Sequence, residues 1–513
     1  MRLMCLMFLL WTGGVQASGW PLGAAPDTTG RPRVRIERAE AILRSASLAG
    51  VQRLVGDVVL GYRSSTLRCD SAWRFDDGRF QAMGGVWVTD PEGFSLRADE
   101  VLMDPGTDRL AASGRQVVLG DGASSVRAPR LEYHLVDRVA RFAGGGTIET
   151  GTERITARNG RYELGSKRLQ LGGNVVLETP GEIIRSDSLH IDRARSGMAF
   201  LGPTRVLRRD GTFEMRCARG RLNDEGDTGW LTGTNAAPVE VRQGADWLTA
   251  DTVAWEGGLE QPGPGSWRTA SGRVVLTDTL GENRLTGGHL RVWLAADSAE
   301  NMRMTGGADR VEMHHRSAED STLLRCDTLF RFPDRLVAFP AVSFWQGDRV
   351  GACDTLHWFT EDERLEMRQE PALWFEGQTI QADSIDVFQD ANGSGELRAR
   401  GHAFAMTPVL DSAFHQVAGR HITGYFAART LHTLLAEGNG EVIYVVASEG
   451  PEDHLLSRAT CSRLRIDFDA GVLQQVVLLD GPSGVMQDWS YATPEEQHIP
   501  GCIWRDPPPA PGQ

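Results

Sequence analysis

Lysine is almost absent from this chain of 513 residues: Lys167 is the only one, and arginine supplies the other basic residues. Acidic residues outnumber basic ones by 68 to 54, which gives a net charge of −14. This balance disfavours nucleic acid as the main partner, because phosphate binding needs a surplus of Lys and Arg. A hydrophobic fraction of 41% is ordinary for a folded protein and excludes wholesale disorder.

Signature motifs of several enzyme classes are also missing. The sequence contains no Gly-Lys phosphate loop, no HExxH pair and no GxSxG elbow. P-loop, zincin and serine-hydrolase functions therefore have no motif support, and no cofactor is predicted. Beyond the first residues, no apolar run approaches the roughly 18 residues that a membrane-spanning helix needs.

Residues 1–17 have the features of a secretory signal peptide. Arg2 supplies the initial charge, a short apolar stretch follows, and Val15, Gln16 and Ala17 form a small-residue cleavage site. We expect the mature protein to begin at Ser18, with a leader over residues 18–32. The predicted location is the periplasm, with an association with the outer membrane left open.

Self-similarity with a period of about 29 residues is the strongest signal in the sequence. In each period an apolar residue is followed two positions later by a small residue, which we call the anchor. The anchors are Ala39, Cys69, Ala98, Ala128, Ala157, Ser186, Cys217, Ala250, Gly287, Cys326, Cys353, Ala382, Gly419 and Cys461. Aspartate follows the anchor at positions 70, 99, 187, 251, 327, 354 and 383.

A second motif falls in the other half of each period and reads apolar-x-small-x-Gly-x-Val-x-apolar, as in residues 80–88. Both motifs alternate with period 2, which is typical of strands. At the acidic residue the alternation slips by one position, so a straight strand would turn its second half to the opposite face. A bend or bulge at the aspartate would return both halves to one interior, and its carboxylate can bind nearby backbone N–H groups.

These patterns predict an all-β fold in which two bent strands per period stack into two facing sheets. With one strand per sheet per period at about 4.8 Å, fourteen periods would be roughly 65 Å long. The Pro- and Gly-rich stretch 257–265 separates N-terminal repeats, 33–256, from more irregular repeats, 266–485. Residues 486–513 lack the repeat and are predicted to form a Pro-rich tail.

These motifs resemble the OstA-like, or LptA-type, family of lipopolysaccharide-transport proteins. Residues 53–60, 69–73 and 80–86 carry the resemblance, and residues 499–504 resemble the end of long OstA-like proteins of Bacteroidetes-type bacteria. The resemblance implies a β-jellyroll, or β-taco, solenoid whose apolar groove holds lipid acyl chains. The repeat array is far longer than an LptA-type module.

The same resemblance implies a non-enzymatic carrier or bridge for lipopolysaccharide or lipooligosaccharide in the periplasm. It implies other β-taco transport proteins of the inner and outer membranes as partners. The array should also end in unpaired strand edges, near residues 34–41 and 473–479, which would allow end-to-end self-association. We expect the Pro-rich tail to shield the second edge.

The predicted groove is lined by apolar positions of both motifs. The predicted lipid-groove residues are Leu96, Val101, Met103, Ile155, Tyr162, Leu169, Leu171, Ile184, Leu189 and Ile191. The pattern itself fits a closed solenoid core equally well. The family resemblance favours an open groove, since uncovered apolar surface attracts lipid.

Other interpretations remain open for the cysteines and aspartates. The anchor cysteines are interpreted as small buried residues rather than metal ligands, although an exported chain would permit a Cys326–Cys353 disulfide. The aspartates are interpreted as bend residues rather than a calcium ladder. The alternative functions are a polysaccharide-active enzyme on a parallel β-helix, with Asp327 and Asp354 as its carboxylate pair, and a structural surface solenoid.

Overall fold

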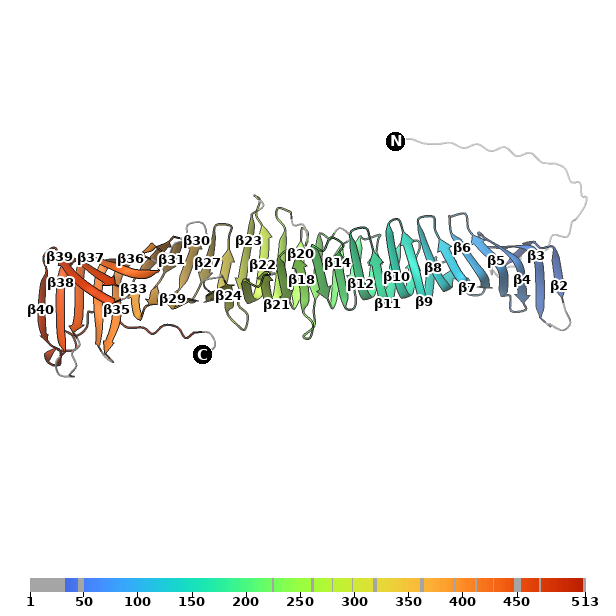
Figure 1. Cartoon of the computed structure of the whole chain (residues 1–513). Coiled ribbons are helices and arrows are strands. Elements are labelled where there is room, and N and C mark those ends of the chain that lie inside the picture. The colour runs from blue at the N-terminus through green and yellow to red at the C-terminus, as the bar shows by residue number, and fades with distance from the viewer. Residues whose placement is uncertain are drawn as a thin grey trace, which may run out of the picture.

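Antiparallel hairpins follow one another along a single extended ladder, from β2 at one end to β40 at the other (Figure 1). The computed structural model describes residues 33–44, 50–223, 226–259, 263–278, 280–297, 299–316, 321–359, 364–390, 394–410, 413–427, 429–446, 454–469 and 472–510. In these ranges forty strands form one sheet, and the only helix is the short 3₁₀ helix η1 (Trp489–Tyr491). The all-β prediction is confirmed.

The predicted signal peptide and leader lie outside the described residues. Within the described ranges, no helix is long and apolar enough to cross a membrane.

The ladder begins with two short strands and continues with long ones. They are β1 (Arg35–Arg38), β2 (Ala41–Arg44), β3 (Val51–Tyr62), β4 (Ser65–Phe75), β5 (Phe80–Thr89), β6 (Ser95–Asp104), β7 (Arg109–Gly120), β8 (Ser124–His134), β9 (Val139–Thr150), β10 (Glu153–Glu163), β11 (Arg168–Glu178) and β12 (Glu182–Asp192).

In the middle of the chain most strands are divided in two at the bend. These strands, with the undivided β21 and β22 among them, are β13 (Gly197–Phe200), β14 (Thr204–Arg208), β15 (Phe213–Cys217), β16 (Arg219–Asn223), β17 (Thr228–Thr232), β18 (Val239–Gln243), β19 (Asp246–Ala250), β20 (Thr252–Glu256), β21 (Trp267–Asp278), β22 (Asn283–Leu294), β23 (Glu300–Thr305), β24 (Val311–Arg316), β25 (Ser321–Cys326), β26 (Thr328–Arg331), β27 (Arg335–Phe339), β28 (Val342–Gln346), β29 (Arg349–Cys353), β30 (Thr355–Phe359), β31 (Arg364–Arg368), β32 (Ala372–Phe375), β33 (Gln378–Gln381) and β34 (Ser384–Gln389).

The final strands are mostly long again. They are β35 (Gly395–Leu410), β36 (Ala413–Ala427), β37 (Thr430–Val446), β38 (Leu455–Asp469), β39 (Val472–Leu479) and β40 (Ser483–Asp488).

Each bent strand turns both of its halves to one interior, as β6 illustrates. Leu96 and Ala98 are buried before the bend, and Val101 and Met103 are buried after it. The pairing of β6 with β7 shifts register around Asp99, so a bulge absorbs the slip in the alternation, as predicted. We call the half-sheet that contains the anchors wall 1 and the other half-sheet wall 2.

The prediction of one strand per sheet per period is wrong. Because every strand bends near its middle, both strands of a period cross both walls: Leu96 pairs with Leu119 in wall 1, while Met103 pairs with Leu110 in wall 2. Each wall therefore gains two strands per period. At about 4.8 Å per strand, fourteen periods measure roughly 130 Å, twice the predicted length.

The acidic residue of the first motif packs on the glycine of the second motif in the neighbouring strand. A Cβ atom added to Gly84 would lie 2.8 Å from the Cβ atom of Asp70, and Gly84 has a φ of +83°. The same arrangement joins Asp99 to Gly114, and there the backbone N–H of Arg115 also donates to Asp99 Oδ2 at 2.8 Å. The two motifs thus recur together because they meet at each bend.

One apolar cluster fills the interior from Leu54 to Ile466. Of the fourteen anchors, eleven are buried, and Ala39, Gly287 and Gly419 are half-buried. The prediction that anchors face inward is confirmed. The cluster continues on both sides of the stretch 257–265, and the division into two sets of repeats stays a prediction.

The tail does not shield the last strand, so that expectation is wrong. After η1 the chain turns back and lies against the outer face of wall 1, as the C-terminal trace in Figure 1 shows. The indoles of Trp345 and Trp374 donate to the carbonyl groups of Pro508 and Arg505, at 3.4 and 2.8 Å. Among the described residues, β39 and β40 pair only with β38.

Candidate functional site

The ten predicted groove residues all lie in the interior between the two walls. Leu96, Ile155 and Ile184 belong to wall 1, and the other seven belong to wall 2. Each has at most 4% of its surface exposed. The repeat therefore brings them together as predicted, but their side chains largely fill the interior between the walls.

Direct cross-strand neighbours explain this packing. In wall 1, Leu177 pairs with both Ile155 and Ile184. In wall 2, Leu169 pairs with Tyr162 on one side and with Ile191 on the other. Side chains that stand opposite each other on one face of a sheet are within contact distance, so each wall presents a continuous apolar surface.

Turns at the free ends of the two walls face each other on the side away from the bends, and we call the line between them the mouth. At the second wall-1 turn, the ring of Phe94 stacks on Tyr133 of wall 2 with centroids 4.3 Å apart. The hydroxyl group of Tyr162 donates to Asp121 Oδ2 across the mouth at 3.2 Å. Burial is the main reason that the pKa of Tyr162 is raised.

A cavity of about 460 Å³ lies between the walls next to the predicted residues. Its apolar lining comes from both walls and includes Ile184, Met198, Phe200, Val206, Met215 and Trp255. Glu182 of wall 1 and Asp227 of wall 2 lie at its border, beside the turns of the mouth. Apolar side chains of both walls thus surround a space that polar groups border.

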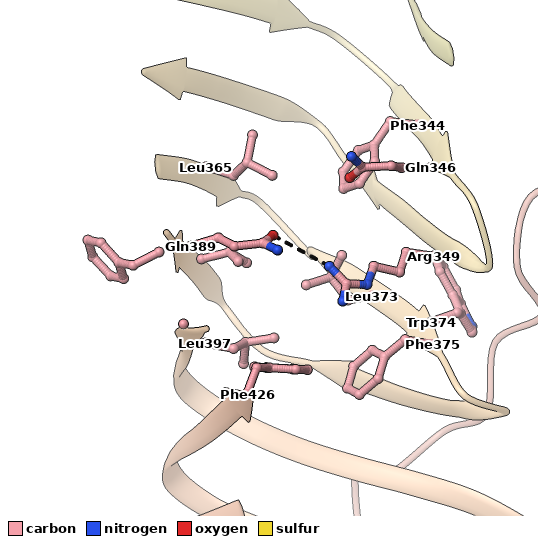
Figure 2. Close-up of a pocket in the computed structure, with 13 residues that line it drawn as sticks. Phe344, Gln346, Arg349, Leu365, Leu373, Trp374, Phe375, Gln389, Leu397 and Phe426 are labelled. Carbon is pink, nitrogen blue, oxygen red and sulfur yellow. Dashed lines mark hydrogen bonds between the residues drawn. The ribbon is translucent and has the colours of Figure 1, made fainter. Parts of the chain in front are cut away.

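A smaller interior cavity of about 70 Å³ lies further along the array (Figure 2). Phe344, Leu373, Phe375 and Phe426 line it, and Arg349 lies at its border. Figure 2 shows the Arg349 guanidinium reaching toward Gln389, with Nη1 and Oε1 3.5 Å apart. Polar groups thus border the apolar space here, as they do at the larger cavity.

Sequence reasoning missed most of the cavity lining. Of the ten predicted residues only Ile184 lines the larger cavity. Met215 lies two positions before the anchor Cys217, the repeat position that Leu96 and Ile184 occupy. The signal was therefore present, but the weaker repeats after residue 200 were not included in the prediction.

The anchor cysteines are buried and free, in agreement with their interpretation as small core residues. Burial raises the pKa of both Cys326 and Cys353 to about 12. Their strands, β25 and β29, are separated by β28, so the two cysteines lie two strands apart in wall 1. A separation of about 9 to 10 Å exceeds the reach of a disulfide.

The enzyme alternative assumed a parallel β-helix, which requires parallel pairing of strands. The described strands pair antiparallel, so the fold is not a parallel β-helix. Asp327 lies at a bend and forms an ion pair with Arg310 at 2.9 Å. Asp354 lies at the next such bend, where its Oδ2 accepts from Thr355 at 3.2 Å. The described residues hold no group of three His, Cys, Asp or Glu side chains placed to bind a metal ion.

The fold is therefore a two-walled, antiparallel repeat array with an apolar interior. Residues 31–187 match the model of the OstA-like protein family, a stretch that contains the three N-terminal segments on which the resemblance rests. This part of the chain is OstA-like, as the sequence predicted.

Among solved structures, the chain is similar to LptH, described as the LptA homologous periplasmic component of the conserved lipopolysaccharide transport device from Pseudomonas aeruginosa. The identity is 16%, over 31% of this chain and 85% of that chain, with a TM-score of 0.14. No curated protein matches the chain.

Proposed function

We propose that this protein is a periplasmic carrier or bridge in lipopolysaccharide or lipooligosaccharide transport, and that acyl chains bind between its two walls. The observation that carries the proposal is the apolar interior, which extends from Leu54 to Ile466 and includes a cavity bordered by the mouth. The OstA-like match over residues 31–187 supports the transport role.

Burial energetics fit this role. Each methylene group moved from water into the interior contributes about 0.8 kcal/mol, so a few methylenes per chain suffice for retention. A wall built from similar repeats offers similar surfaces along its length. A lipid can therefore move along the wall with little change in its binding free energy. The partners would be β-taco proteins that continue the walls at either end, and no catalytic step is required of this chain.

The first test is mass spectrometry of lipid that co-purifies with the protein from a native envelope. We expect lipopolysaccharide or lipooligosaccharide in the wild type, and less in Leu189→Asp than in Asp187→Asn. Leu189 is fully buried in wall 2, whereas Asp187 lies at a bend. A buried charge costs several kcal/mol, so Leu189→Asp is informative only if circular dichroism shows an intact fold.

A cavity-filling variant keeps the test decisive. Met215→Trp adds volume to the larger cavity without adding charge, so it should reduce bound lipid while the fold persists. Wild-type lipid content in folded Met215→Trp and Leu189→Asp would contradict the proposed interior site.

A further inference from the structure

Four polar contacts cross the mouth in succession along the N-terminal part of the array, in addition to the Phe94–Tyr133 ring stack. They are Arg63–Asp108, Glu92–Arg138, Asp121–Tyr162 and Glu153–Arg193. In each contact one residue belongs to a wall-1 turn, or the strand end beside it, and the other belongs to the corresponding part of wall 2. The wall-1 members recur at intervals close to one repeat, so the contacts form a row.

The first contact shows how the two walls are joined. Arg63 Nε lies 2.7 Å from Asp108 Oδ1, and the hydroxyl group of Tyr62 donates to the same oxygen at 2.6 Å. The hydrogen bond from Arg63 is the main cause that lowers the pKa of Asp108, so this carboxylate is charged at neutral pH. Burial, with the bond to Asp108, raises the pKa of Tyr62 to about 12, so the phenol keeps its proton.

The spacing of these contacts differs from that of ordinary hairpin pairs. Their members are 40 to 46 residues apart, which exceeds one repeat. Each contact therefore ties a wall-1 turn to a wall-2 turn of the following repeat.

We propose that these four contacts are a row of latches that hold the N-terminal mouth shut and open reversibly to admit apolar chains. The ligand part of this inference rests on the proposed function; the opening itself does not. Three of the four contacts are partly exposed ion pairs. Such pairs are individually weak and are screened by salt, so these latches can open without unfolding the walls. The sheet and the bends carry the fold, and the latches control access to the interior.

The first experiment measures opening without any lipid. Spin labels at Pro91→Cys and Val136→Cys flank the Glu92–Arg138 latch, and both positions are exposed. In the full chain we expect the distance distribution to broaden toward longer values in about 1 M NaCl and in Arg63→Gln/Arg138→Gln/Arg193→Gln. The control is Arg79→Gln, because Arg79 pairs with Asp77 in the same turn at 2.8 Å and no mouth is crossed. Unchanged distances in salt and in the triple variant would overturn the latches.

The second experiment measures entry with N-phenyl-1-naphthylamine, a dye that fluoresces in apolar surroundings. We expect the triple variant to take up the dye about three-fold faster or more, since the loss of three latches lowers the barrier to opening. A short bis-maleimide across Pro91→Cys and Val136→Cys should slow uptake, and Arg79→Gln should behave as wild type. Equal uptake rates in all forms, with label distances that do respond, would support the latches and overturn their role in ligand entry.

Discussion

At the scale of single residues, the bend depends on an acid that covers a glycine. Asp70 lies over Gly84, and Asp251 and Asp383 lie over Gly272 and Gly401 in the same way. A left-handed backbone conformation excludes most side chains at these glycines, and the carboxylate then occupies the space beside them. This contact is a structural reason for the aspartate series, and the calcium alternative is not needed to explain it.

Gly84→Ala should lower the free energy of unfolding by about 2 to 3 kcal/mol, because it combines backbone strain with a clash against Asp70. The control is Gly78→Ala, whose φ of +87° is similar but whose added Cβ would meet no atom within 4 Å. Urea denaturation of the two variants should separate strain from clash. If both variants lose equal stability, the acid–glycine contact is unimportant; if Asp70→Ala rescues Gly84→Ala, it is confirmed.

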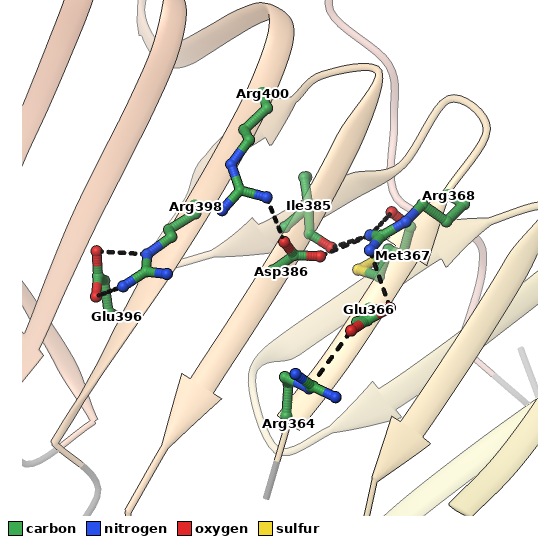
Figure 3. A network of polar contacts seen from close by, with 9 residues as sticks. All are labelled: Arg364, Glu366, Met367, Arg368, Ile385, Asp386, Glu396, Arg398 and Arg400. Atoms are coloured by element: carbon green, nitrogen blue, oxygen red, sulfur yellow. Dashed lines mark hydrogen bonds and ion pairs between the residues drawn. The ribbon is translucent and has the colours of Figure 1, made fainter. Parts of the chain in front are cut away.

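At the scale of elements, ion-pair networks on the outer face of wall 2 link neighbouring strands. Figure 3 shows Asp386 of β34 between Arg368 of β31 and Arg400 of β35, with distances of 2.6 and 2.7 Å. Arg368 also contacts Glu366 at 3.0 Å. Only 9% of the Asp386 side chain is exposed, so this carboxylate is far less screened than most surface acids here.

Asp386→Asn should destabilise the C-terminal repeats by about 1 to 3 kcal/mol, because two guanidinium groups lose a shared and largely buried counter-ion. Asp480→Asn is the matched control, since Asp480 pairs with Arg463 at 2.6 Å but is 53% exposed. Thermal unfolding should show a clear shift only for the first variant. Equal shifts in both variants would mean that burial adds nothing to this network.

At the scale of the whole molecule, the tail covers part of the outer face of wall 1, over β32 and β33. All eight residues of β32 and β33 are buried, although neighbouring strands of a two-walled array should alternate. The carboxamide of Gln416 explains how the tail is held: its Nε2 donates to the carbonyl group of Gln497 at 2.8 Å, and its Oε1 accepts from the N–H of Ile499 at 2.9 Å. Ile499 and Cys502 join a second apolar cluster with residues of β35, β36, β37 and β38.

Gln416→Ala should cost about 1 to 3 kcal/mol, because it leaves buried backbone groups of the tail without partners. Hydrogen exchange should accelerate in residues 495–505 and in β36, while β6 to β12 stay protected. Gln170→Ala, at an exposed position of β11, is the control. If Gln416→Ala leaves exchange in residues 495–505 and β36 as it is in the wild type, the tail is not coupled to wall 1.

Removal of residues 497–513 should expose β32 and β33 but leave the terminal edge at β39 and β40 as it is, since the described tail residues bind elsewhere. Self-association through that end should therefore be unchanged in sedimentation experiments. This differs from what the position of the tail in the sequence suggested, because only its path in space shows which surface it covers.

Local periodicity was enough to determine the strands, the bends at the aspartates and the inward direction of the anchors. These features depend on residues within one period, such as Leu96, Ala98 and Val101, and the two-residue alternation leaves them a single consistent arrangement. The number of strands per wall, the latches such as Arg63–Asp108, the cavity beside Met215 and the path of the tail were decided only by the tertiary structure. Each of these depends on residues that are far apart in the chain, or on how successive repeats fit together, and an alternating pattern carries no information about either.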